Sequence, residues 1–255
     1  TPTSLWLVTY DGLKLFDKVS KTLKPFPYTE STNQLLSQEL YSFLIYDGFI
    51  WLNGESGLSA VDIVTGEVTF IDLASTLIGS NNIWGVHPPL PEHPNKVIYS
   101  TVDTLWAYDY KKHEFVELLK LADQSDTDHF SIDNYVIDKK GTLWIAYSGV
   151  GLFGYDAESL EKKYEFNSRN SIIDNNVYGL QLDDVGNLWF STHDGIFMMD
   201  IDDNHIRQFN MGDGLAASEF NYGAYTKLAN GLFAYGGMSG LSIFDPIILH
   251  YAEGV

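Results

Sequence analysis

Aromatic side chains recur along this chain at one position of a repeating pattern, and each is followed by a small or polar residue. The equivalent positions carry four aromatic rings and one carboxylate: Tyr41, Trp84, Asp133, Tyr178 and Tyr222. The residues that follow them are Ser42, Gly85, Asn134, Gly179 and Gly223. Aromatic faces are flat apolar surfaces on which a sugar ring can stack. The pattern therefore indicates a ligand-binding surface, although strand alternation also favours packing of the same rings against a neighbouring unit.

Polar side chains stand close to these positions. Asn82, Asn176 and Asn221 each lie within two residues of an aromatic position, and carboxamides exchange hydrogen bonds with hydroxyl groups. This combination suits a neutral polyol such as an oligosaccharide. A second group falls in predicted turns, where we expect solvent-exposed side chains: Tyr10, Asp11, Glu55, Asp103, His193 and Asp194. Of these, we add His193 to the candidate ligand-binding residues.

A repeating scaffold must position these residues, and hydrophobic stretches define its period. The stretches centre on residues 6, 51, 98, 144, 189 and 233, which are 45, 47, 46, 45 and 44 residues apart. Each is followed by a second apolar stretch that ends in aspartate, at positions 17, 62, 109, 156, 200 and 245. A period this regular over the whole chain indicates repeated supersecondary units.

Each period contains four short stretches of alternating hydrophobicity separated by turn residues. In the fifth, the expected strands are 176–182, 188–192, 196–200 and 205–209. Four antiparallel strands in about 45 residues are typical of a β-propeller blade. We therefore predict an all-β fold of six four-stranded blades over residues 1–246, beginning at 5, 41, 82, 131, 176 and 220.

The ends of the repeat predict a longer protein. The first unit begins on its second strand, so we expect the blades to continue in a seven-bladed or double propeller. A six-bladed ring with irregular closure is the alternative. Residues 247–255 are expected to form a C-terminal strand or the start of a linker to a following domain.

Several recurrent residue types have structural explanations. The tryptophans at 6, 51, 144 and 189 are large enough to fill the space between adjacent blades. A glycine before the third strand of five repeats (Gly12, Gly57, Gly151, Gly195 and Gly240) predicts a tight turn with positive φ. The aspartate at the end of that strand can accept hydrogen bonds from backbone amides of the next turn. Its recurrence in all six units argues for a structural role rather than a catalytic one.

Composition excludes several classes of function. The chain has 15 Lys and Arg against 34 Asp and Glu, a net charge of −19, which disfavours nucleic-acid and membrane-surface binding. The absence of cysteine excludes disulfides, cysteine-ligated zinc and thiol catalysis. No apolar stretch is long enough for a transmembrane helix, so we expect no membrane insertion by this segment.

Two acidic segments could suggest a metal, and neither has the required pattern. Asp200–Asn204 lacks the glycine and terminal glutamate of a calcium loop and occupies a turn that recurs in other units. The segment containing Asp123, Asp126, Asp128 and His129 has no counterpart in the repeat and is expected to be a solvated loop, with a weak cation site as the minor alternative. The histidines show no metal-ligand spacing. We therefore predict no cofactor and no metal.

The segment Asp183–Ile196 of the fifth repeat reads D-D-V-G-N-L-W-F-S-T-H-D-G-I. It resembles the repeat of the two-component regulator propeller family, which is approximately D-x-x-G-x-L-W-[IF]-[GS]-T-x-x-G-[IL]. Asp138–Ala146 is a second copy. The segment Gly212–Asn221, continuing through Gly236–Leu241 to Phe244–Pro246, is similar to the last propeller repeat of these sensors. The third unit departs from the pattern, with 87–94 in place of a tight turn and Val97–Tyr99 in place of L-W-[IF].

The resemblance implies a sensor that is not itself an enzyme. Such propellers stand outside the inner membrane, in the periplasm, and are followed by a β-sandwich, a membrane helix and a cytoplasmic histidine kinase or diguanylate cyclase. It implies an oligosaccharide or small polar ligand, contacts with the remaining blades and following domains of the parent chain, and a possible homodimer. Two alternatives stay open: a protein-interaction scaffold, and a metal-dependent lyase of the streptogramin type that would use His193 and Glu219.

Overall fold

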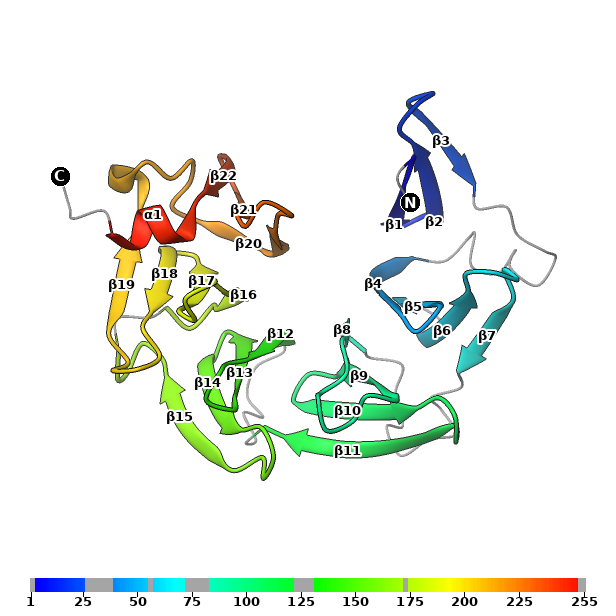
Figure 1. Ribbon diagram of the computed structural model, residues 1–255, viewed down its shortest axis with the longest axis horizontal. Coiled ribbons are helices and arrows are strands. Elements are labelled where there is room, and N and C mark those ends of the chain that lie inside the picture. The colour runs from blue at the N-terminus through cyan, green and yellow to red at the C-terminus, as the bar shows by residue number, and fades with distance from the viewer. Residues whose placement is uncertain are drawn as a thin grey trace. The chain divides into compact units, whose positions relative to one another are not determined.

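The described part of the chain is built mainly from antiparallel sheets (Figure 1). It is a computed structural model that describes residues 3–25, 39–54, 57–71, 83–121, 131–171 and 174–251. Within these ranges there are six sheets. The chain divides into two compact units, Thr1–Asp123 and Gln124–Val255, and each contains three of the sheets.

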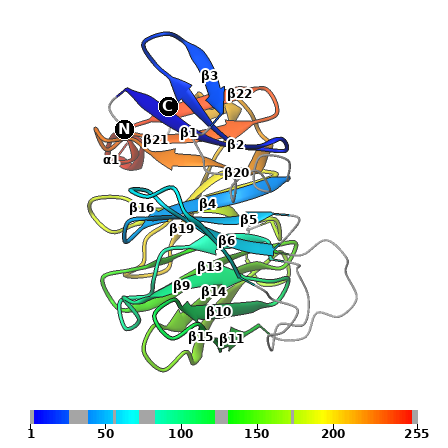
Figure 2. The ribbon, with the colours of Figure 1, turned by 90° about the vertical axis from the view of Figure 1, so that its right-hand side faces the viewer.

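The first unit contains sheets β1–β3, β4–β7 and β8–β11. Figure 2 shows these sheets layered in chain order. Their strands are β1 (Ser4–Thr9), β2 (Gly12–Asp17), β3 (Thr22–Pro25), β4 (Leu40–Tyr46), β5 (Phe49–Gly54), β6 (Gly57–Asp62), β7 (Val68–Ile71), β8 (Gly85–His87), β9 (Lys96–Ser100), β10 (Thr104–Asp109) and β11 (Glu114–Lys120).

The second unit contains sheets β12–β15, β16–β19 and β20–β22. Their strands are β12 (Ser131–Ile137), β13 (Thr142–Ser148), β14 (Gly151–Asp156), β15 (Lys162–Phe166), β16 (Tyr178–Leu182), β17 (Leu188–Thr192), β18 (Gly195–Met199), β19 (Ile206–Phe209), β20 (Phe220–Lys227), β21 (Phe233–Gly237) and β22 (Gly240–Phe244). A 3₁₀ turn, η3 (Met211–Asp213), precedes β20. The first strands β12, β16 and β20 run side by side along one edge of this unit.

Two features differ from six uniform four-stranded blades. The sheets β1–β3 and β20–β22 have three strands each within the described residues. The C-terminal strand considered for 247–255 does not form over residues 247–251, because Pro246–Tyr251 is the short helix α1. Asp245 accepts hydrogen bonds from the amides of Ile247 and Ile248 at 2.9 and 3.3 Å. These hydrogen bonds cap the first turn of α1 and help to begin a helix where the other repeats form a turn.

The hydrophobic core lies between successive sheets, as the tryptophan pattern predicts. Trp144 packs between β12–β15 and β16–β19, and Trp189 packs between β16–β19 and β20–β22. Trp51 has the same role between β4–β7 and β8–β11. These three indoles are at most 2% exposed, whereas Trp6 is half-buried. Each sheet is thus covered by its neighbour within a unit.

Strand pairing corrects the predicted centre of the sixth repeat. Trp189 pairs with Met198, and the residue with the equivalent pairing in the last sheet is Ala234, opposite Ile243. The predicted centre, Phe233, instead pairs with Phe244 and packs toward the preceding sheet. The spacing of aromatic residues points to Phe233 because it is the nearest aromatic residue to a position that carries no large side chain here.

The aspartate of the D-x-x-G-x-L-W segment binds both its own turn and the following tryptophan. Asp183 accepts hydrogen bonds from the amides of Val185, Gly186 and Asn187 at 3.1, 2.7 and 2.8 Å. Its second oxygen accepts from the indole nitrogen of Trp189 at 2.9 Å. Asp138 makes the equivalent bond to Trp144 at 2.8 Å. In the sixth repeat, both members of the pair are missing, since Leu228 and Ala234 replace them.

The aspartate that ends each third strand caps the turn after it, which confirms the prediction. In each of the six repeats, the Oδ1 atom of this aspartate accepts at least one backbone amide two or three residues later. In the fourth repeat, Asp156 accepts hydrogen bonds from the backbone amides of Glu158 and Ser159 at 3.1 and 2.9 Å. Lys163 adds an ion pair to the same carboxylate at 2.6 Å. The six aspartates are therefore structural.

Protonation of these capping aspartates should destabilise the fold at low pH. The hydrogen bond from Lys163, and then those from Ser159 and Glu158, hold the pKa of Asp156 well below its ordinary value. A depressed folded-state pKa stabilises the protein above the unfolded-state pKa of about 4, and this stabilisation is lost as the pH falls. We expect the melting temperature of Asp156→Asn to fall less than that of the wild type between pH 6 and pH 3. Glu158→Gln, which removes a neighbouring exposed carboxylate, should follow the wild type; an equal response of both variants would contradict this explanation.

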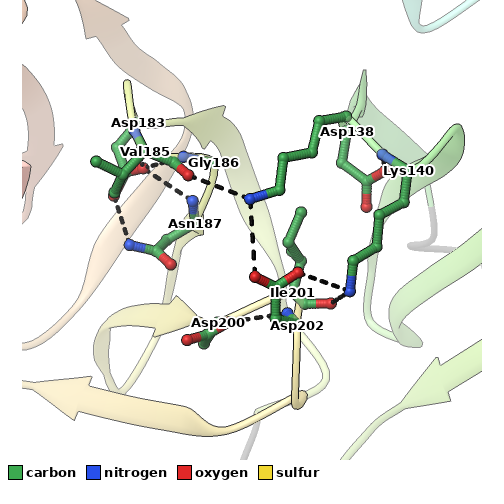
Figure 3. Close-up of polar contacts among 10 residues, drawn as sticks. Asp138, Lys140, Asp183, Val185, Gly186, Asn187, Asp200, Ile201 and Asp202 are labelled. Atoms are coloured by element: carbon green, nitrogen blue, oxygen red, sulfur yellow. Dashed lines mark hydrogen bonds and ion pairs between the residues drawn. The ribbon is translucent and has the colours of Figure 1, made fainter.

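Lysine side chains connect neighbouring sheets of the second unit at the turns (Figure 3). Lys140 donates to the carbonyl of Ile201 at 2.5 Å and pairs with Asp202 at 2.9 Å. Asp202 belongs to the segment that superficially suggests a calcium loop, but its carboxylate forms an ion pair with Lys140. No group of three potential metal ligands occurs in the described part of the chain. Asp123, Asp126, Asp128 and His129 lie outside the described residues.

Candidate functional site

The predicted binding residues lie at an irregularity at the start of the first strands. The pairing register shifts between Leu40 and Ser42 in β4, between Ile132 and Asn134 in β12, and after Tyr178 in β16. An extra residue at such a bulge is not paired in its own sheet and bends the strand. The bulges of β4 and β12 therefore leave Tyr41 and Asp133 out of the regular ladder, whereas Tyr178 still pairs with Ser191 and the bulge of β16 falls on the residues after it.

The structure brings together four predicted residues of the second unit and one serine that the sequence pattern did not indicate. We call Asp133, Ser148, Tyr178, His193 and Tyr222 the first-strand cluster. The hydroxyl of Tyr178 lies 3.1 Å from His193 Nε2 and accepts a weak hydrogen bond from Ser148 Oγ at 3.4 Å. The rings of Tyr178 and Tyr222 meet edge to face, with centroids 5.9 Å apart.

The two tyrosines of the cluster differ in their exposure to solvent. Tyr178 is 6% exposed, whereas Tyr222 is 44% exposed. Burial nevertheless raises the pKa of both phenols, and the carboxylate of Asp133 raises them further. The hydroxyl of Tyr222 also hydrogen-bonds to Ser131. Tyr222 therefore anchors its polar end in the protein and leaves part of its ring available for contact.

The charge around the cluster is negative. Asp133, Asp174 and Glu219 all lie close enough to Tyr178 to raise its pKa electrostatically. Asp174 is half-buried and accepts the backbone amide of Asn176 at 2.7 Å, and Glu219 is exposed. A field of this sign favours neutral or cationic groups over anionic ones.

The other predicted residues have varied positions. Asn176 is half-buried and Asn221 is exposed, while Asn82 lies outside the described residues. Tyr41 and Trp84 belong to the first unit and are 50% and 48% exposed. The hydroxyl of Tyr41 donates to Glu39 at 3.5 Å.

The turns between second and third strands hold the remaining candidates. Tyr10 is 76% exposed, Asp11 and Asp194 are exposed, and Asp103 is half-buried. Glu55 lies outside the described residues. His193 differs from this group, because its ring packs against Tyr178 with centroids 5.5 Å apart.

Two serines of this region were not among the residues predicted to bind a ligand. Ser131 and Ser148 pair directly across β12 and β13, and each contacts a tyrosine of the cluster. Their only signal in the sequence was their position at the two ends of strands that lead to a predicted loop. A serine there is too common in turns to indicate binding.

Comparisons with known proteins agree with the resemblance seen in the sequence. No family model matches the chain. A relative named histidine kinase P4, from Formosa agariphila, is 28% identical over 96 residues, which make up 38% of this chain and 7% of that protein. The extracellular domain described as that of a hybrid two-component system of B. thetaiotaomicron has a TM-score of 0.78 at 19% identity. The chain has a β-propeller fold. The aligned part covers 99% of this chain and 34% of that structure.

A second solved structure gives the same result. The extracellular domain described as that of a one-component system of B. thetaiotaomicron has a TM-score of 0.73 at 17% identity, covering 94% of this chain and 31% of its own. Both likenesses show the propeller fold. The chain thus spans about a third of the solved structures that it resembles. In the described residues, no helix is both long and apolar enough for a membrane span.

Proposed function

We propose that this chain belongs to the extracytoplasmic, periplasmic sensing region of a bacterial two-component sensor. In the parent protein, the remaining blades and the following domains would transmit ligand binding to a cytoplasmic output domain, with a homodimer as a possible assembly. The likeness to extracellular domains of such systems supports this proposal, as does the similarity to a histidine kinase.

We assign ligand binding to the first-strand cluster, and an oligosaccharide or similar small polar molecule as its ligand. The observation that carries this assignment is the half-exposed ring of Tyr222 beside the buried ring of Tyr178. An exposed aromatic ring suits the stacking of a sugar. The exposed side chains of Asn221, which precedes Tyr222, and of His193, which packs against Tyr178, suit hydrogen bonding to sugar hydroxyl groups. The surrounding carboxylates favour a neutral sugar over an acidic one.

Calorimetry with tetrasaccharides tests this proposal. Cellotetraose, xylotetraose and mannotetraose serve as neutral probes, and tetragalacturonate serves as the anionic probe of equal length. We expect one neutral probe to bind and to raise the melting temperature. Tyr222→Ala should weaken its binding about three- to tenfold, because a stacked ring contributes about 0.5–1.5 kcal/mol.

The control variant is Phe70→Ala. Phe70 is an aromatic residue of the outermost strand β7 with a similar exposed fraction, 40%, and its removal should leave binding unchanged. Equal weakening by both variants would contradict the assigned site. Stabilisation by Mg²⁺ or Ca²⁺ alone, reversed by EDTA, would favour the lyase alternative, and no response to any probe would favour the interaction scaffold.

A further inference from the structure

Asp133 is the one member of the repeated position that is not aromatic, and its side chain has a different role from the others. Its Oδ2 accepts the backbone amide of Gly179 at 2.7 Å. Its Oδ1 accepts the backbone amide of Gly223 at 3.2 Å. One carboxylate of β12 thus binds the first strands of both following sheets, β16 and β20.

The two bound amides belong to the residues that directly follow the tyrosines of the cluster. Gly179 follows Tyr178, and Gly223 follows Tyr222. Both glycines have positive φ, 64° and 67°, a conformation that L residues rarely adopt. At Gly179 a Cβ atom would also lie 2.8 Å from the ring of Tyr225. The carboxylate therefore stabilises the two backbone turns that direct the tyrosine side chains.

Burial makes this carboxylate unusual. Asp133 is 7% exposed, and loss of hydration raises its pKa to about 6, although the two amide hydrogen bonds oppose the shift. The titratable groups that face it are phenols on β16, β20 and β21: Tyr178, Tyr222, Tyr225 and Tyr235. The pKa of each of these phenols is raised, so all four are neutral near pH 6. Within this set, Asp133 is the group whose charge changes near neutral pH.

We propose that Asp133 is the positioning residue of the first-strand cluster: it fixes Tyr178 and Tyr222 relative to one another through the amides that follow them, and its protonation loosens this arrangement. The effect on ligand binding rests on the function proposed above. A neutral carboxylic acid has a hydroxyl oxygen that no longer accepts well from an amide. We expect the longer contact, to Gly223, to be lost first, which frees the exposed Tyr222 to move.

Amide NMR tests the positioning role without any ligand. In ¹H–¹⁵N spectra between pH 4.5 and 8, the amides of Gly179 and Gly223 should shift together with one midpoint near 6. The matched control is the amide of Leu180, which donates to the carboxamide of Asn134 at 3.0 Å in the same strand and should shift far less. The joint titration should be absent in Asp133→Asn. The inference is overturned if the two glycine amides shift no more than Leu180, or if their midpoint persists in the variant.

Calorimetry with the neutral tetrasaccharides named above tests the link to binding. Wild-type affinity should be about five- to tenfold weaker at pH 5 than at pH 7.5, as expected for the loss of one hydrogen bond, and Asp133→Asn should show no such difference. Histidines also change charge in this range, so the pH effect must survive in His193→Gln. Its disappearance there would assign the effect to His193 and overturn the link to Asp133. If no tetrasaccharide binds, the proposed function fails, whereas the amide titration still decides the positioning role.

Discussion

Replacement of Asp183 by alanine should lower the free energy of unfolding by about 3–5 kcal/mol, as for the removal of one partner from a buried charged network. Asp183 is 5% exposed, and alanine would leave the turn amides and the Trp189 indole without their acceptor. Urea denaturation followed by circular dichroism measures the change. No other single substitution in this turn should cost as much.

The neighbouring residue provides a matched control. Asp184 carries the same carboxylate, but its side chain is 74% exposed and pairs with Lys227 at 2.7 Å on the surface. Exposed ion pairs contribute at most about 1 kcal/mol, so Asp184→Ala should cost less than this amount. A similar loss in both variants would show that the buried hydrogen bonds are not the source of the effect.

Replacement of Trp189 by alanine should cost about 3–5 kcal/mol, the range for truncation of a large buried aromatic residue. Trp189 is fully buried. Its ring stacks on Phe209 with centroids 5.4 Å apart and meets the edge of Phe233 at 6.2 Å. The cavity left by alanine would lie between two sheets and remove contacts from both. Denaturant unfolding, compared with the wild type, gives the loss directly.

Two further variants make this second prediction specific. Trp84→Ala removes an indole that is 48% exposed and should change stability far less. Because Asp183 and Trp189 share a hydrogen bond, the double variant should cost less than the sum of the two single variants. Strict additivity would contradict the direct coupling between turn and core.

The repeat, the strands and the residues that close the turns could all be predicted from the amino-acid sequence. Period-two alternation and a regular spacing are local properties, so they predict sheets such as β16–β19 nearly to the residue. The capping role of Asp156 and its equivalents could also be predicted, because an aspartate binds amides only two or three residues away. The aligned position of Asp133, Tyr178 and Tyr222 follows from the same regularity.

The roles of the residues at one repeated position depend on the packing of neighbouring sheets and could not be predicted in the same way. Tyr178 is buried and Tyr222 is half-exposed, while Asp133 binds amides 46 and 90 residues away. Alternation fixes which face of a sheet a side chain occupies, but a partner on a neighbouring sheet depends on how the sheets pack. The same limit explains Ala234, whose pairing rather than its residue type identifies it as the counterpart of Trp189. Local pattern thus determines the blades of this protein, and packing between blades determines its candidate site.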